Sequence, residues 1–185
     1  MKIQDWFPRG RTNNRAITGA IYEQIVAAAR QPELYAEWGV PDTPLGRFEM
    51  IGLHLFLFLH RVRNSTGALA ELAQSVTDAF FEDVDSSVRE LGIGDSGVPK
   101  RVKRLAKMFY GRVMAYGGAL EAGDELMLSG ALARNVRPDL ADWNGAAPLA
   151  AYVRQAHAMI LEQSDTAIAA GRMRFPEAGV ERTQG

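Results

Sequence analysis

The sequence contains no cysteine, and this single absence removes several kinds of chemistry. Structural disulfides, thiolate zinc sites and thiol nucleophiles all require that residue. The absence of cysteine is typical of a protein in a reducing compartment. Residues 1–10 also lack the apolar run of a secretory signal. We therefore expect a cytoplasmic protein. Peripheral binding to the inner face of the cytoplasmic membrane remains open.

Long hydrophobic runs are missing as well. The most apolar stretch, Phe48 to Leu59, is interrupted by Glu49 and His54 and falls far short of the ~20 residues that a membrane span requires. The net charge of −1 gives no overall attraction to nucleic acid, so we expect no DNA partner. A hydrophobic fraction of 47% beside 23% charged residues predicts instead a folded globular domain.

Motifs of known catalytic sites are absent from the sequence too. The histidines, His54, His60 and His157, lack the spacing of a zinc-binding helix, and there is no nucleophile elbow or P-loop. Residues 92–97 have the glycine spacing of a dinucleotide-binding loop, but they follow a helical segment rather than a strand, which favours a turn between helices. The sequence thus predicts no enzyme and no cofactor. A haem or small-molecule binder with His54 as a ligand is the alternative.

One expected helical face carries three carboxylates, Asp78, Glu82 and Asp85. Di-iron helical bundles combine such carboxylates with Glu-x-x-His pairs from two helices, and those pairs are missing here. We therefore interpret this cluster as a solvated face and predict no metal site.

Helical periodicity runs along the whole chain, and no window alternates as a strand does. We predict an all-α protein whose single compact domain, at residues 14–170, has about six helices. A flexible arm at residues 1–13 and a flexible tail at residues 171–185 flank it. The expected helices span about Asn14–Arg30, Pro44–Arg63, Ala68–Leu91, a segment from Pro99 onward, Asp124–Arg134 and Pro148–Ala170, with one short turn of helix at Glu33–Trp38.

The helix expected from Pro44 is apolar nearly all round. Asp42 or Thr43 can cap its first free amides, and Pro44 sits where a missing N–H costs nothing. A helix that is apolar on every side either lies in the core or is half covered by a partner, and both remain open. In the helix from Pro99, Gly111 favours a close backbone approach at its position.

The charges are strongly segregated along the chain. Residues 71–95 hold seven acids against one base, whereas residues 100–112 hold six bases and no acid. In one interpretation, the acidic and basic helices are neighbours whose charges pair. In the other, the basic side is a docking surface for acidic partners, phospholipid headgroups or RNA phosphates. Arg47 and Arg112, which adjoin aromatic residues, are expected to stack on rings or to pair with a carboxylate such as Asp78 or Asp85.

Several stretches, in order between residues 22 and 135, resemble the ubiquinol–cytochrome c chaperone family. They are Arg30–Tyr35, Gly39–Met50, Leu53-His54, Asp78–Asp85, Arg89–Asp95, Val98–Lys103, Phe109–Arg112 and Ala133–Asn135. The resemblance implies a non-catalytic helical chaperone that holds newly made cytochrome b during assembly of ubiquinol–cytochrome c reductase. It also implies that a second small assembly factor or the ribosome is a further partner.

A holder for such a client needs an apolar groove beside a charged rim, as peptide-in-groove binders have. We expect aromatic, histidine and charged side chains to form this partner-binding surface. The candidates are Tyr35, Trp38, Arg47, His54, Asp78, Asp85, Arg89, Lys100, Lys103, Arg104, Lys107, Tyr110 and Arg112.

Overall fold

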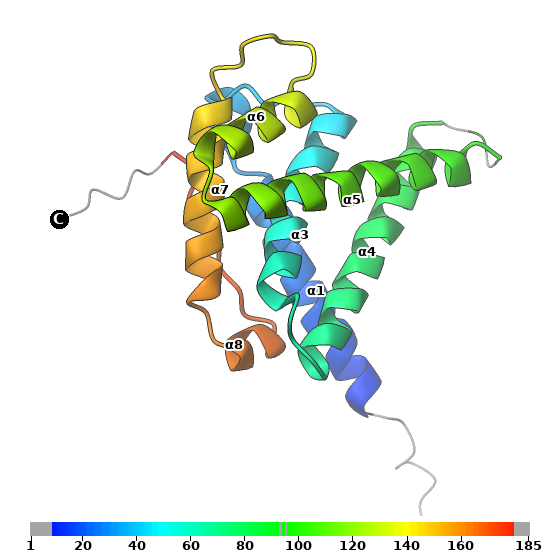
Figure 1. The fold of residues 1–185 in the computed structure, drawn as a ribbon. Helices are drawn as coiled ribbons and strands as arrows, with labels where there is room; N and C mark the ends of the chain where they lie inside the picture. Colours follow the sequence, from blue (N-terminus) through cyan, green and yellow to red (C-terminus); the bar gives the residue numbers. More distant parts are fainter. Residues whose placement is uncertain (1–8, 93, 95, 180–185) are drawn as a thin grey trace, which may run out of the picture.

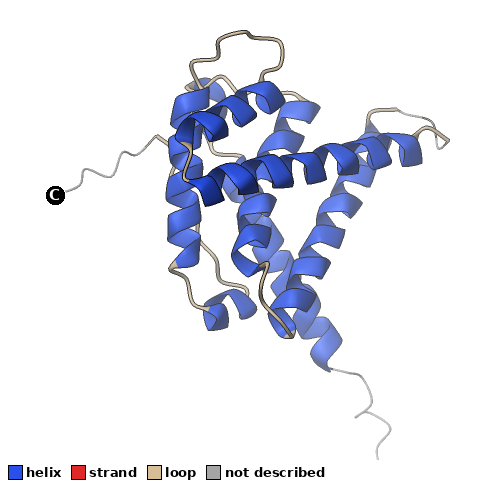
Figure 2. Ribbon diagram, in the orientation of Figure 1, coloured by secondary structure: helices blue, strands red, loops and turns tan. Residues whose placement is uncertain are grey.

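Eight α-helices joined by loops account for the described part of the chain, which covers residues 9–92, 94 and 96–179 of this computed structural model (Figure 1). No strand occurs among these residues (Figure 2), as the sequence predicts. The helices are α1 (Arg9–Ala29), α2 (Pro32–Ala36), α3 (Pro44–Val62), α4 (Ala68–Glu90), α5 (Val98–Ala122), α6 (Glu125–Val136), α7 (Ala146–Leu161) and α8 (Asp165–Ala169).

The apolar helix α3 is the centre of the core. Helices α1, α4, α5, α6 and α7 all contact it, and Figure 1 shows α5 crossing in front of it. From Phe48 to Phe58 every residue is buried, with Phe56, Leu57 and Phe58 at most 1% exposed. The chain itself therefore covers this helix, and the alternative of a helix half covered by a partner is excluded.

The start of α3 follows the expected capping chemistry. The Thr43 hydroxyl oxygen accepts a hydrogen bond from the Gly46 amide at 3.1 Å, and Pro44 occupies the first helical position. Asp42, the other candidate cap, instead forms an ion pair with Arg47 at 2.7 Å.

The expected helices agree with the observed ones, with shifts at both ends of the chain. α1 begins at Arg9 rather than at Asn14, and the segment expected as one helix from Pro148 divides into α7 and α8. The division lies at Ser164, whose hydroxyl oxygen accepts a hydrogen bond from the Ala167 amide and starts the new helix. No helix in the described ranges is long and apolar enough to cross a membrane.

Residues 171–179 are packed against the domain, so its expected boundary at residue 170 lies too early. The Gln24 side chain donates to the Gly171 carbonyl at 2.8 Å and accepts from the Met173 amide at 2.7 Å. Gln31 accepts from the Ala178 amide at 2.7 Å. These glutamines supply the backbone partners that a buried extended segment needs, and the buried Met173 side chain adds apolar contact. Residues 180–185 of the expected tail and residues 1–8 of the expected arm lie outside the described residues.

Candidate functional site

A groove of about 490 Å³ lies where the start of α3, the second half of α4 and the first turns of α5 meet. Its floor is apolar, and the rings of Phe48 and Phe80 stack there with their centroids 5.6 Å apart. Aromatic pairs of this kind add to the stability of the surface that they build. The buried side chains of the floor are Phe48, Ile51, Phe80, Val84, Val88 and Leu105.

Two leucines at the mouth of this groove are exposed. Leu45 on α3 is 47% exposed, and Leu91 just after α4 is 55% exposed. Large apolar side chains beside an apolar hollow form a continuous surface that a partner can cover. The groove therefore offers more apolar area than its floor alone.

Charged side chains of both signs surround the apolar surface: Arg30, Arg47 and Arg101 are basic, and Asp83 and Glu90 are acidic. Arg47 is held by Asp42, and this contact lowers the pKa of the Asp42 carboxyl. Asp83 accepts a hydrogen bond from the Tyr22 hydroxyl at 2.8 Å. Burial and the Asp83 carboxylate raise the pKa of Tyr22, so this phenol keeps its proton. Two of the five rim residues, Arg47 and Asp83, are thus held by contacts from the loop before α3 and from α1.

Beyond the groove, the outer side of α5 carries the basic cluster. Lys100, Arg101, Lys103, Arg104 and Lys107 are all exposed. Within the described residues, none of the five forms an ion pair with a carboxylate. Two of the nearby acids of α4 bind other residues: Asp83 accepts from Tyr22, and Asp85 pairs with Arg89 at 2.6 Å. The interpretation in which α4 and α5 pair their charges is therefore wrong for the described residues, and the docking interpretation stays open.

Arg112 is a structural residue rather than part of a surface. Its guanidinium forms two hydrogen bonds of 2.5 Å to the carboxylate of Glu49 on α3, which is 4% exposed. Asp78 and Asp85, the carboxylates proposed from the sequence, bind Gln74 and Arg89 on their own helix instead. The described residues contain no group of three or more side chains that could hold a metal ion.

His54 is likewise a core residue, which corrects its assignment as a partner-binding residue or haem ligand. Its ring is fully buried, and Nδ1 lies 2.7 Å from the Met50 carbonyl oxygen, which can only accept. Nδ1 therefore carries the hydrogen, and Nε2 accepts from the Tyr152 hydroxyl at 2.7 Å. Both nitrogens are used, so neither is free for a ligand. Burial lowers the pKa of His54 to about 4.

The buried imidazole predicts a loss of stability in mild acid. The pKa of His54 is lowered in the folded state, so the unfolded chain binds more protons and stability is full only above an unfolded value of about 6.5. We expect His54 alone to remove about 2 kcal/mol between pH 7.5 and pH 5. His60, whose pKa burial also lowers to about 4, acts in the same direction. Urea unfolding across this range measures the slope. A His54→Gln variant that kept the full slope would contradict the assignment.

The remaining aromatic candidates are half-buried or exposed. Tyr35 donates its hydroxyl hydrogen to the Ala29 carbonyl at 2.8 Å, and the Trp38 ring contacts Tyr152 with centroids 5.8 Å apart. Both pack within the chain and do not line the groove. Tyr110 is 55% exposed on α5, close to the basic cluster.

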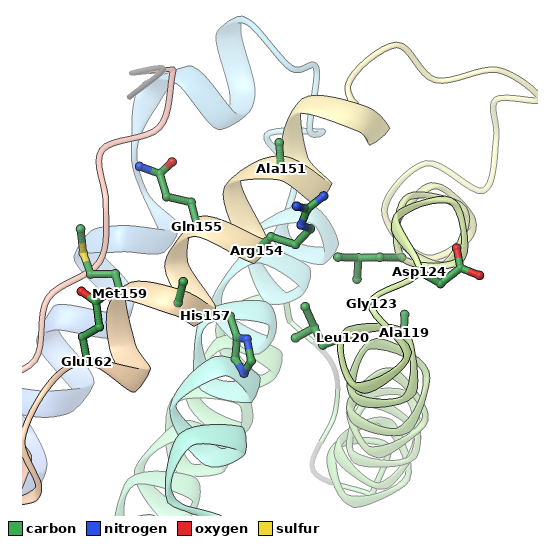
Figure 3. Close-up of a pocket in the computed structure, with 12 residues that line it drawn as sticks. Ala119, Leu120, Gly123, Asp124, Ala151, Arg154, Gln155, His157, Met159 and Glu162 are labelled. Atoms are coloured by element: carbon green, nitrogen blue, oxygen red, sulfur yellow. The ribbon is translucent and has the colours of Figure 1, made fainter. Parts of the chain in front are cut away.

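A second hollow, of about 570 Å³, lies between α7 and the junction of α5 with α6. Figure 3 shows His157 on α7 and Leu120 on α5 at opposite sides of it. Its walls mix small side chains with separate polar groups, and none of the expected partner-binding residues lines it. The groove at the α3–α4–α5 junction, in contrast, contains Arg47 and adjoins the basic cluster.

The comparison with known proteins agrees with the resemblance noted in the sequence. A family model for the ubiquinol-cytochrome C chaperone matches residues 36–175, which make up most of the chain. The chain belongs to this family. The Cbp3 homolog from Brucella abortus has a crystal structure similar to the structure of this chain, with a TM-score of 0.88, 55% sequence identity, and coverage of 96% of this chain and 98% of that one.

A more distant relative of this chain comes from Xenopus laevis. It is named ubiquinol-cytochrome-c reductase complex assembly factor 1 and is 23% identical over 116 residues, which cover 63% of this chain and 58% of the relative. The chain thus aligns with little more than half the length of its amphibian relative.

The short stretches that carry the family resemblance converge in space. Residues from five of them line the groove, namely Arg30–Tyr35, Gly39–Met50, Asp78–Asp85, Arg89–Asp95 and Val98–Lys103. None of them lines the second hollow. In this protein, the groove is therefore the place where family-like sequence, apolar surface and charge coincide.

Proposed function

We propose that this protein is a non-catalytic assembly chaperone that binds newly made cytochrome b during biogenesis of ubiquinol–cytochrome c reductase. The groove at the α3–α4–α5 junction is the proposed client site. The observation that carries the proposal is the convergence of five family-like stretches on one apolar groove with a charged rim. Family membership supports the class of function.

The form of the groove suits an apolar segment of a membrane-protein client. Amphipathic or apolar helices bind in grooves through side chains spaced by one turn, and charged loops beside them contact the rim. Leu45 and Leu91 on the two sides of the groove mouth would clasp such a segment. The rim arginines and carboxylates would meet the polar loops that flank a membrane span. Binding of this kind requires no reaction, and the groove contains no histidine.

A paired substitution at the groove mouth tests the client site. We expect Leu45→Asp/Leu91→Asp to reduce the cytochrome b that co-purifies from solubilised membranes by about tenfold or more, because each carboxylate would be desolvated under the client. Both side chains are about half exposed, so the variant should fold, which circular dichroism can verify. Mass spectrometry of the co-purified proteins identifies and quantifies the client.

The matched control is Leu126→Asp/Leu161→Asp, which changes two leucines that are 85% and 50% exposed and lie outside the groove. It should capture the client as the unmodified protein does. Equal capture by the groove variant would show that the client binds elsewhere. Normal maturation of cytochrome b in cells that lack this protein would refute the proposed function itself.

A further inference from the structure

The basic cluster on α5 lowers the stability of its own helix. Helix N-termini favour acidic side chains, yet α5 has no acid in its first turn and no base in its last. Lys100, Lys103 and Lys107 follow one another at helical spacing, where like charges repel. No carboxylate among the described residues pairs with these lysines, so nothing in that part of the chain offsets the repulsion between them.

From this arrangement we infer that the outer side of α5 docks on the anionic phospholipid headgroups of a bilayer. The inference rests on the proposed function, which puts the client in a membrane. Figure 1 shows that the corner between α4 and α5 stands away from α7 and α8, so it can approach a flat surface. Basic residues near an anionic leaflet are attracted by its negative surface potential.

Apolar side chains on the same side of the helix favour lipid over other acidic partners. Tyr110 and Met114 continue the helical spacing of Lys103 and Lys107, and they are 55% and 77% exposed. At a bilayer interface, such residues enter the headgroup layer while lysines reach the phosphates. The phosphates of RNA and the carboxylates of acidic peptides provide no apolar layer for a methionine to enter. Cytoplasmic loops of membrane proteins are themselves rich in lysine and arginine, so this side of α5 is unsuited to them.

Vesicle binding by the full chain tests the inference. We expect the protein to sediment with phosphatidylcholine vesicles containing about one third phosphatidylglycerol, and not with phosphatidylcholine alone. Raising the salt from about 0.05 M to about 0.5 M should release it. Lys100→Glu/Lys103→Glu/Lys107→Glu should lower the partition coefficient at least ~100-fold, since each basic residue contributes about fivefold.

A charge-matched control separates this surface from the net charge. Arg15→Glu/Arg172→Glu/Arg174→Glu makes the same change in charge at exposed positions on α1 and in the segment after α8, and it should keep vesicle binding. The inference fails if the two triple variants behave alike, or if the unmodified protein shows no preference for phosphatidylglycerol. Tighter binding of a single-stranded RNA or of polyglutamate than of the vesicles, measured at equal concentrations of negative charge, would overturn it in favour of that partner.

The two proposals can fail separately. Client capture from detergent-solubilised membranes by the lysine-reversed variant should be unchanged, and Leu45→Asp/Leu91→Asp should still bind vesicles. If vesicle binding is absent while the groove variant loses cytochrome b, only the docking inference falls. If vesicles bind and no cytochrome b is captured, only the proposed function falls.

Discussion

Replacing Arg112 by methionine is expected to lower the free energy of unfolding by about 3–5 kcal/mol, because it leaves a buried charge without its partner. Glu49 is 4% exposed on the central helix α3, and both of its carboxylate oxygens are bound by the Arg112 guanidinium at 2.5 Å. Urea unfolding followed by circular dichroism measures the loss. A change below about 1 kcal/mol would show that solvent reaches Glu49 in the folded protein.

The pH dependence of this variant gives a second test. Burial raises the pKa of Glu49, and the hydrogen bonds from Arg112 oppose that rise. Without the guanidinium, the folded-state pKa rises further above the unfolded value, so stability falls as the pH rises through it. The loss relative to the unmodified protein should therefore be larger at pH 8 than at pH 5.

A double substitution is the control for this ion pair. Glu49→Met/Arg112→Met removes both charges and keeps similar volumes, and such replacements are often neutral. We expect its stability to lie within about 1 kcal/mol of the unmodified protein. A double variant as unstable as Arg112→Met alone would mean that packing around the arginine stem, rather than charge, makes the contribution.

The sequence predicts the helices well because their ends depend on local chemistry. Thr43 and Pro44 start α3 through contacts with residues at most three positions away. In contrast, the partner of Arg112 is 63 residues distant and depends on how α3 and α5 cross. Charge patterns indicated Asp78 and Asp85, but both lie on α4 and bind neighbours one turn away. Local patterns therefore do not identify the pairs that join two helices.

In the candidate site, too, features that are local in the sequence could be predicted and contacts between distant residues could not. The basic residues of α5 are evident from the sequence, and they are indeed exposed. The sequence analysis does not predict Leu45 and Leu91 at the site. In an apolar sequence pattern, an exposed leucine cannot be distinguished from a leucine that is buried in the core. Leu45 and Leu91 both line the groove where α3, α4 and α5 meet, and their exposure depends on how these helices are arranged. His54 was placed on the surface because the sequence does not reveal that Tyr152, 98 residues away, supplies its second hydrogen bond.

Gly46→Ala is expected to lower the free energy of unfolding by at least about 3 kcal/mol, since the new methyl group has no room. A Cβ atom at this position would lie 1.9 Å from the Pro41 carbonyl oxygen and 2.9 Å from its carbon, and both are backbone atoms. The loop before α3 would have to move, which would disturb the Thr43 cap and the ion pair between Asp42 and Arg47. Because Arg47 borders the groove, loss of client capture should accompany the loss of stability.

Gly111→Ala is the matched control, and its effect should have the opposite sign. Among the described residues, no atom outside its own turn of α5 comes within 4 Å of the position of a Cβ there, so the close backbone approach expected from the sequence does not occur within this part of the chain. Alanine restricts the unfolded chain and favours the helix, which should raise the free energy of unfolding by up to about 1 kcal/mol. Both variants add one methyl group to a helical glycine. If they shifted the urea midpoint equally, the contact with Pro41 would not determine the effect at Gly46.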